Sequence, residues 1–247
     1  MLTIALALAL AADPAAPPRN TYQQREKGAA HAPAGPAGAS RAGSAKVQGA
    51  GGQHGNPGDL KAYAAGLLDP KRDAWQKPEE VLKALALAPG QVACDVGAGP
   101  GYFTLRLAQA VGPSGRVYAV DVEPALLAAL RDRLGEVRHV TPVLAVGDDP
   151  LLPLGACDVV LVVNTFHHFP DGVAYLWRLA ASLRPGGRIV NVDFQKRETP
   201  VGPPLAARVS REDFLAAAAS AGLSVVAEPD VLPHQYLVVL APGARGP

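Results

Sequence analysis

From residue 57 onward, the chain alternates short runs of apolar, β-branched residues with stretches whose apolar residues recur at helical spacing. The apolar runs lie at 91–95, 116–122, 139–148, 157–164 and 188–194. Such alternation predicts parallel strands connected by crossover helices, which together form a doubly wound α/β fold. The run at 157–164 is almost entirely apolar, as is typical of a central strand covered on both faces.

Two further runs, 223–229 and 234–240, bring the expected number of strands to seven. Only residues 230–233 connect them, which is too short for a crossover helix, so we expect an antiparallel hairpin. Ser210 with Asp213 three residues later is a variant of the capping box and predicts a helix start. Other helices are expected after Pro78 and at 102–111, 124–134 and 172–183.

The first 56 residues differ in composition from the rest. Residues 1–12 are an apolar segment with a candidate signal-peptidase site at 9–11, but no Lys or Arg precedes it. The segment is too short to span a bilayer, and both export and a cytoplasmic location are open. Residues 13–56 are rich in Ala, Gly and Pro and are expected to be a disordered linker. The folded domain is expected at 57–247.

Charge and cysteine content narrow the class of ligand. Residues 57–247 carry 18 Lys/Arg and 20 Asp/Glu without a basic cluster, so a small-molecule ligand is favoured over nucleic acid. The chain has two cysteines, Cys94 and Cys157, which are too few for a disulfide framework or a zinc cluster. Both adjoin expected strands, and we expect them to be buried, unreactive thiols.

The sequence ACDVGAGPGYF places Gly97, Gly99 and Gly101 directly after an expected strand and before a helix. Glycine allows close approach of a ligand to the backbone, and a helix N-terminus offers unpaired N–H groups, so this loop is expected to bind a nucleotide-like ligand. The dinucleotide fingerprint is incomplete because Tyr102 occupies the place of its third glycine. Asp95, two residues before Gly97, would repel a pyrophosphate on this loop and attract an amine. Its alternative role is to cap backbone amides of the loop.

Further acidic residues follow the next two expected strands. Asp121 lies twenty residues after Gly101, where a carboxylate can accept hydrogen bonds from both ribose hydroxyls. Capping the helix that begins near Pro124 is the alternative role of Asp121. Asp148 and Asp149 end the third strand. One of them is expected to contact an adenine amine; the alternative is that both are simply turn residues.

The fourth strand is followed by NTFHHF, at the edge where open α/β sheets bind their ligands. His167 and His168 would point to opposite sides of an extended segment, so we expect one in a pocket and one packed. His167 is the candidate general base toward an acceptor hydroxyl or thiol, because imidazole titrates near neutral pH. A structural imidazole bonded to loop backbone is the alternative.

The segments DVGAGPGYFTLRLA, VYAVDVEPALL, VGDDPLLPLGACDVVLVVNTFHHF and LRPGGRIVNVDF resemble, in this order, the motifs of class I S-adenosylmethionine-dependent methyltransferases. The resemblance extends over about 57–243 and is greatest to small-molecule enzymes related to the quinone-biosynthesis C-methyltransferases. It implies a Rossmann-like, mostly parallel seven-stranded sheet with a C-terminal antiparallel hairpin. It also implies that Trp75 and Gln76 belong to a lid region, with plain packing as the alternative.

The resemblance further implies that S-adenosylmethionine is the cofactor. The glycines of the loop would frame the methionine end of the cofactor, and Asp95 would face its amino group. Asp121 would hold the ribose, and Asp148, or else Asp149, would contact the adenine amine. The whole set expected to bind the cofactor is Asp95, Gly97, Ala98, Gly99, Gly101, Asp121, Val122, Asp148, Asp149 and Asn164. No metal ligands are expected.

The implied activity is transfer of a methyl group to a small-molecule acceptor, with the acceptor atom open between O, N, S and C. Because the methyl group on a sulfonium is already electrophilic, alignment of the reactants can supply most of the catalysis. A cofactor-binding but inactive relative is the alternative, and Tyr102 disfavours a nicotinamide-dependent oxidoreductase. Neither a nucleic-acid partner nor a transmembrane helix is expected.

Overall fold

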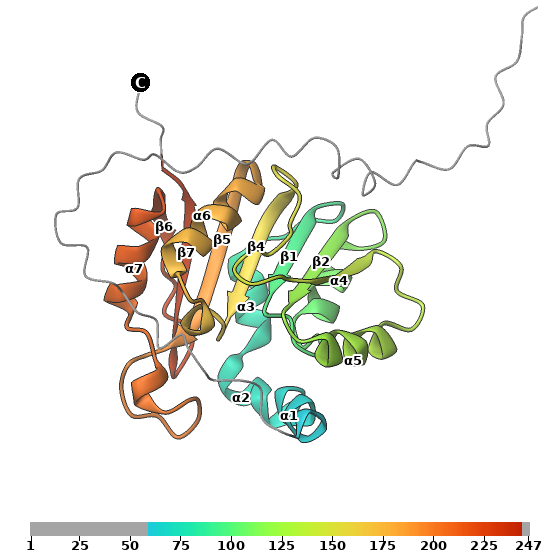
Figure 1. Ribbon diagram of the computed structural model, residues 1–247, viewed down its shortest axis with the longest axis horizontal. Coiled ribbons are helices and arrows are strands. Elements are labelled where there is room, and N and C mark those ends of the chain that lie inside the picture. Colours follow the sequence, from blue (N-terminus) through green and yellow to red (C-terminus); the bar gives the residue numbers. More distant parts are fainter. Residues whose placement is uncertain (1–58, 244–247) are drawn as a thin grey trace, which may run out of the picture. The chain divides into compact units, whose positions relative to one another are not determined.

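The computed structural model describes residues 59–243, which contain a seven-stranded sheet (Figure 1). The strands are β1 (Val92–Val96), β2 (Arg116–Asp121), β3 (Val140–Leu144), β4 (Cys157–Val163), β5 (Leu183–Phe194), β6 (Leu223–Ala227) and β7 (Gln235–Pro242). Their order across the sheet is β3-β2-β1-β4-β5-β7-β6. Strand β7 is antiparallel to both neighbours and the other pairs are parallel. The doubly wound sheet and the C-terminal hairpin are thereby confirmed.

Helices follow β1, β2 and β4, whereas no helix lies between β3 and β4. The α-helices are α1 (Leu60–Leu67), α2 (Asp73–Gln76), α3 (Pro78–Leu85), α4 (Thr104–Val111), α5 (Pro124–Leu134), α6 (Gly172–Ser182) and α7 (Arg211–Ser220), and the 3₁₀ helices are η2 (Pro70–Arg72), η3 (Phe166–His168) and η4 (Leu205–Ala207). Ser210 caps α7 as expected, because its side chain accepts the N–H of Asp213 at 3.0 Å. The hydrophobic pattern does not predict α1, which has no buried residue.

The core lies in two layers, one on each face of the sheet. Helices α6 and α7 contribute Leu176, Leu179 and Phe214 to the first layer. Helices α3, α4 and α5 contribute to the second, for example through Leu107 and Leu130. Burial of both faces explains why β4 reads as an apolar run in the sequence.

Strand β3 is shorter than the apolar run that predicts it. It ends at Leu144, and Val146 and Asp149 then form an isolated antiparallel bridge. Gly147, between them, has a positive φ of 58°, so the chain turns there and leaves the sheet. The last residues of the predicted strand are therefore a turn at the sheet edge.

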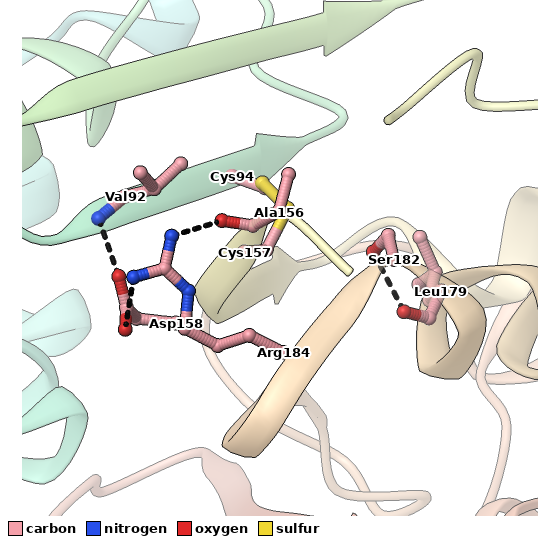
Figure 2. Close-up of a disulfide and its surroundings, with 8 residues drawn as sticks. All are labelled: Val92, Cys94, Ala156, Cys157, Asp158, Leu179, Ser182 and Arg184. Atoms are coloured by element: carbon pink, nitrogen blue, oxygen red, sulfur yellow. Dashed lines mark hydrogen bonds and ion pairs between the residues drawn. A yellow bond between two sulfur atoms is a disulfide. The ribbon is translucent and has the colours of Figure 1, made fainter. Parts of the chain in front are cut away.

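Cys94 and Cys157 form a disulfide, with Cα atoms 6.4 Å apart (Figure 2). The expectation of two thiols is therefore wrong, although both residues are fully buried. Cys94 pairs with Val160, and strict alternation along β4 would turn Cys157 to the opposite face of the sheet. The pairing of β4 with β5 shifts register between Cys157 and Val159, and both cysteines belong to the same core layer.

An ion pair secures the strands beside the disulfide (Figure 2). Asp158 accepts the backbone N–H of Val92 at 2.7 Å and pairs with Arg184 at 3.2 Å. Arg184 also donates to the carbonyl oxygen of Ala156 at 2.8 Å. These contacts join the amino-terminal ends of β1, β4 and β5, so the opposite, carboxyl ends carry the loops available for ligand binding.

The candidate signal peptide at 1–12 and the expected linker at 13–56 lie outside the described residues. Within 59–243, no helix is both long enough and apolar enough to cross a membrane. The longest helices in this range, α5 and α6, have 11 residues each.

Candidate functional site

The strand order reverses between β1 and β4, where β2 and β3 follow on one side and β5 on the other. Open α/β sheets bind ligands at such a switch point, beyond the carboxyl ends of the strands. A cavity of about 960 Å³ lies there, lined by residues after β1, β2, β4 and β5 and by residues of α1, η2 and α2. Its volume is near the upper end for ligand cavities and can accommodate a nucleoside-sized ligand together with a second small molecule.

The glycine loop forms one wall of this cavity. Gly97 and Gly99 line it and have positive φ values of 76° and 53°. A Cβ atom at Gly97 would overlap the hydroxyl oxygen of Thr165, so only glycine fits. Gly101 is needed for another reason: its φ is 88°, and a Cβ atom there would overlap the side chain of Leu130 in α5. Gly101 thus serves helix packing and is not a lining residue.

Asp95, near the end of β1, lines the cavity although only 3% of it is exposed. The Thr104 hydroxyl donates to its carboxylate at 2.6 Å. Burial raises the pKa of Asp95 to about 6, although the hydrogen bond from Thr104 has the opposite effect and lowers it. A positively charged ligand group beside Asp95 would favour the ionised carboxylate, so the site suits an ammonium or a sulfonium.

Asp121 ends β2 with its carboxylate held by the backbone. Gly99 N–H donates to Oδ2 at 2.7 Å and Glu123 N–H donates to Oδ1 at 2.9 Å. Burial raises the pKa of Asp121, and these backbone hydrogen bonds oppose the rise. Each oxygen keeps a further lone pair for a ligand hydroxyl, so this geometry fits a ribose that faces the glycine loop.

The remaining cofactor candidates divide into two groups. Ala98 and Val122 line the cavity. Asp148 and Asp149 are absent from its lining, to which their loop contributes Gly147. The Asp148 carboxylate pairs with Arg178 at 3.2 Å, and Asp149 accepts the N–H of Leu151 at 2.8 Å. Contact of either carboxylate with an adenine remains a prediction, which this arrangement does not support.

Asn164 lines the cavity in a left-handed conformation, with φ 52°. Gln235 donates to its Oδ1 at 2.6 Å, and its Nδ2 donates to Gln76 Oε1 at 3.3 Å. Gln76 donates in turn to Gln235 Oε1 at 2.9 Å. The three carboxamides close a ring that joins α2, the residue after β4, and β7, so the Asn164 side chain anchors α2 to the edge of the sheet. Its contact with the cofactor remains a prediction.

His167 and His168 lie in η3, so the segment is not extended as expected. Both line the cavity, with ring centroids 4.1 Å apart, and the expected division between pocket and core is wrong. His167 is buried, and its Nδ1 lies 3.2 Å from Oδ2 of the fully buried Asp193. Because a carboxylate only accepts, Nδ1 donates to Asp193, and in the neutral imidazole this leaves the lone pair on Nε2. A lone pair on an oriented imidazole can accept a proton from a ligand.

Aromatic residues form the wall next to this pair. Phe194 follows Asp193 directly, and its ring centroid lies 5.4 Å from that of Trp75; both residues line the cavity. Gly202 also lines it, and a Cβ atom there would lie 2.5 Å from the Phe194 ring. This part of the cavity therefore suits a flat, apolar ligand.

The loop between β5 and α7 closes over Phe194 and is organised by one side chain. Arg208, only 5% exposed, donates to four backbone carbonyl oxygens at 2.7 to 3.3 Å. Those oxygens belong to Gln195, Arg197, Val201 and Pro203. The guanidinium also lies 5.1 Å from the Phe194 ring. We term residues 195–208 the Arg208 loop.

Three residues of the site are not predicted from the sequence. Asp193 could have been found, because it lies at the carboxyl edge of a predicted strand, as Asp95 and Asp121 do. Arg72 and Gln235 carry no local signal, since only the tertiary fold brings them to the cavity region. Within residues 59–243, no cluster of three or more His, Cys, Asp or Glu side chains could hold a metal ion.

Comparisons with known proteins agree with this geometry. Residues 93–187 match the model of a methyltransferase domain family. Over 112 residues, 44% of the chain, the protein is 37% identical to an uncharacterized 37.1 kDa protein in transposon TN4556 of Streptomyces fradiae. Over 109 residues it is 34% identical to the ubiquinone/menaquinone biosynthesis C-methyltransferase UbiE of Burkholderia vietnamiensis. The chain spans 32% and 45% of the lengths of these two relatives.

Among solved structures, a SAM-dependent methyltransferase from Aquifex aeolicus aligns with a TM-score of 0.69 and 26% identity. The alignment covers 72% of this chain and 96% of the Aquifex chain, so it extends well beyond the glycine loop and includes most of the sheet. Residues 93–187 thus carry a methyltransferase domain, and the chain is similar in sequence to UbiE and in fold to a SAM-dependent methyltransferase.

Proposed function

We propose that this protein transfers the methyl group of S-adenosylmethionine to a small-molecule acceptor. The observation that carries the proposal is one cavity that is lined by the glycine loop, Asp95 and Asp121 and also by His167, whose imidazole is bonded to Asp193. The first three features suit the cofactor, and the histidine suits an acceptor that must lose a proton. The cavity volume of about 960 Å³ supports simultaneous binding of both molecules.

When bound, S-adenosylmethionine supplies a methyl group on a positively charged sulfur. Asp121 would hold the ribose hydroxyls, and Asp95 would face the positive charge at the methionine end. His167 Nε2 would take the proton of the acceptor, while Asp193 keeps Nδ1 protonated and the ring oriented. Trp75, Phe194 and the Arg208 loop would exclude water and align the acceptor.

The acceptor class follows from the wall beside His167. Aromatic rings and prolines line it, which favours a planar, apolar acceptor with a weakly acidic hydroxyl, thiol or carbon. The UbiE relatives are ubiquinone/menaquinone biosynthesis C-methyltransferases, which supports including quinols in the first screen. Formation of S-adenosylhomocysteine with quinols, phenols and thiols measures the activity. Cofactor binding without turnover on any of them would favour an inactive relative.

Substitution of Asp121 by alanine is expected to weaken binding of S-adenosylmethionine by about 1.5–3 kcal/mol, because it removes a charged acceptor for the ribose hydroxyls. Isothermal titration of the 57–247 segment measures the loss, with Asp132→Ala on the exposed face of α5 as the control. A nicotinamide dinucleotide is titrated in parallel. Unchanged affinity in Asp121→Ala would refute the ribose role, and tight dinucleotide binding would refute the proposed cofactor.

Affinity for S-adenosylmethionine is expected to fall below pH 6. The Asp95 carboxylate attracts the cofactor only when ionised, and burial raises its pKa to about 6. Affinity should therefore be nearly constant above pH 7 and about tenfold lower at pH 5, one unit below that pKa. Titrations from pH 5 to pH 8 measure this, with Asp95→Asn as the control. The same fall in Asp95→Asn would assign the pH dependence to another group.

A further inference from the structure

Arg72 is a half-buried cation that lines the cavity and has no role predicted from the sequence. It ends η2, and its guanidinium lies 4.1 Å from the ring centroid of Tyr102, the residue after Gly101. Nη1 donates to the carbonyl oxygen of Leu67 at 3.0 Å, and Nε and Nη2 donate to Gln76 Oε1 at 3.3 and 3.0 Å. The guanidinium is thus fixed against the glycine loop.

The charge of Arg72 has no direct counterion in the described part of the chain. The ion pairs found among residues 59–243 do not include Arg72. Burial lowers the pKa of Arg72, and the more distant Asp95 opposes this. Two of its five N–H groups also remain without a partner there. A half-buried cation with spare donors at the wall of a cavity is suited to an anionic ligand group.

Asp95 is negatively charged when ionised and Arg72 is positively charged. Both line the cavity, near enough to interact electrostatically. An α-amino acid is a zwitterion, and its two charged groups require this pair of opposite charges. We propose that Arg72 binds the α-carboxylate of S-adenosylmethionine while Asp95 faces its ammonium group. The proposal rests on the proposed function and adds a subsite to it.

A carboxylate or phenolate of the acceptor is the competing source of negative charge. The position of Arg72 favours the cofactor, because its guanidinium packs on Tyr102 of the glycine loop. The guanidinium also lies 5.8 Å from the ring centroid of Trp75, but Tyr102 is the nearer ring. Trp75 belongs with Phe194 and the Arg208 loop to the aromatic wall beside His167. The experiment must still separate the two sources.

The test combines two variants with two ligands. Wild type, Arg72→Met and Arg106→Met are titrated with S-adenosylmethionine and with its decarboxylated form, which keeps the ammonium and the sulfonium. Arg106 is the matched control: its guanidinium also lies over the Tyr102 ring, at 4.3 Å, but it pairs with Asp73 and does not line the cavity. Thermal melts show whether each variant is folded.

Arg72→Met is expected to bind S-adenosylmethionine about 10- to 100-fold more weakly and to bind the decarboxylated form like wild type, because a hydrogen bond to a charged group is lost only with the first ligand. Arg106→Met should bind both ligands like wild type. An equal loss for both ligands, or no loss, would overturn the subsite. A raised KM for the acceptor with unchanged cofactor affinity would assign Arg72 to the acceptor. Wild-type protein that binds neither ligand would overturn the proposed function itself.

Discussion

Replacement of His167 by alanine is expected to lower turnover by roughly 10²-fold or more, while affinity for S-adenosylmethionine changes little. Under the proposed function, the Asp193 carboxylate orients the imidazole, and Nε2 takes the proton of the acceptor. Removal of the ring eliminates the proton acceptor but leaves the glycine loop and Asp121 in place. Steady-state kinetics with the first acceptor identified, together with a cofactor titration, measures both effects.

Two further variants separate catalysis from structure. Asp193→Asn keeps the shape of the buried side chain but removes its charge, so it should lower turnover and shift the pH–rate profile. His139→Gln removes a histidine that bonds to the Ala108 carbonyl and does not line the cavity, so turnover should be unchanged. If His167→Ala lowers stability and cofactor affinity together, the imidazole is structural. Full turnover with an unshifted profile would remove His167 from the mechanism.

Reduction of the Cys94–Cys157 disulfide is expected to lower the free energy of unfolding by about 4 kcal/mol. The two cysteines are 63 residues apart, and a cross-link over a loop of this length restricts the unfolded chain strongly. For a domain of this size, the loss corresponds to a decrease of roughly 10 °C in Tm. Melting curves of oxidised and reduced protein measure it, after mass spectrometry has established the oxidation state.

A Cys94→Ala, Cys157→Ala double variant controls for effects of the reductant. Its melting should not respond to reductant, while that of wild type should. Free thiols in the folded, air-oxidised protein would show that the two sulfur atoms are not bonded. Disulfides persist mainly in oxidising compartments, so the state of these cysteines in cells also bears on the choice between export and a cytoplasmic location.

The sequence predicts the sheet well because its signals are local. Apolar runs mark the strands, and the short connection at 230–233 is enough to specify the antiparallel hairpin of β6 and β7. Asp95 and Asp121 follow from their places at strand ends, and both line the cavity. Periodicity also predicts α5 at its observed bounds.

The errors arise where the tertiary arrangement decides. The disulfide depends on a register shift in β4, which no periodic pattern reveals. The histidine pair depends on one turn of 3₁₀ helix, which reorients neighbouring side chains. The ring of carboxamides joins Gln76, Asn164 and Gln235, which lie as far as 159 residues apart in the sequence. Only the folded chain brings such residues together.

The path of the Arg208 loop along the cavity wall depends little on the identity of the side chains that the loop carries. Its path is held by backbone carbonyl oxygens that converge on one guanidinium, and any residue type supplies such an oxygen. Apart from Gly202, where a Cβ atom would meet the Phe194 ring, side chains between the anchored positions can therefore change without loss of the loop's course. Under the proposed function, substitutions there would alter which acceptor is admitted without changing the glycine loop, Asp95 or Asp121. Acceptor preference would then change independently of cofactor binding.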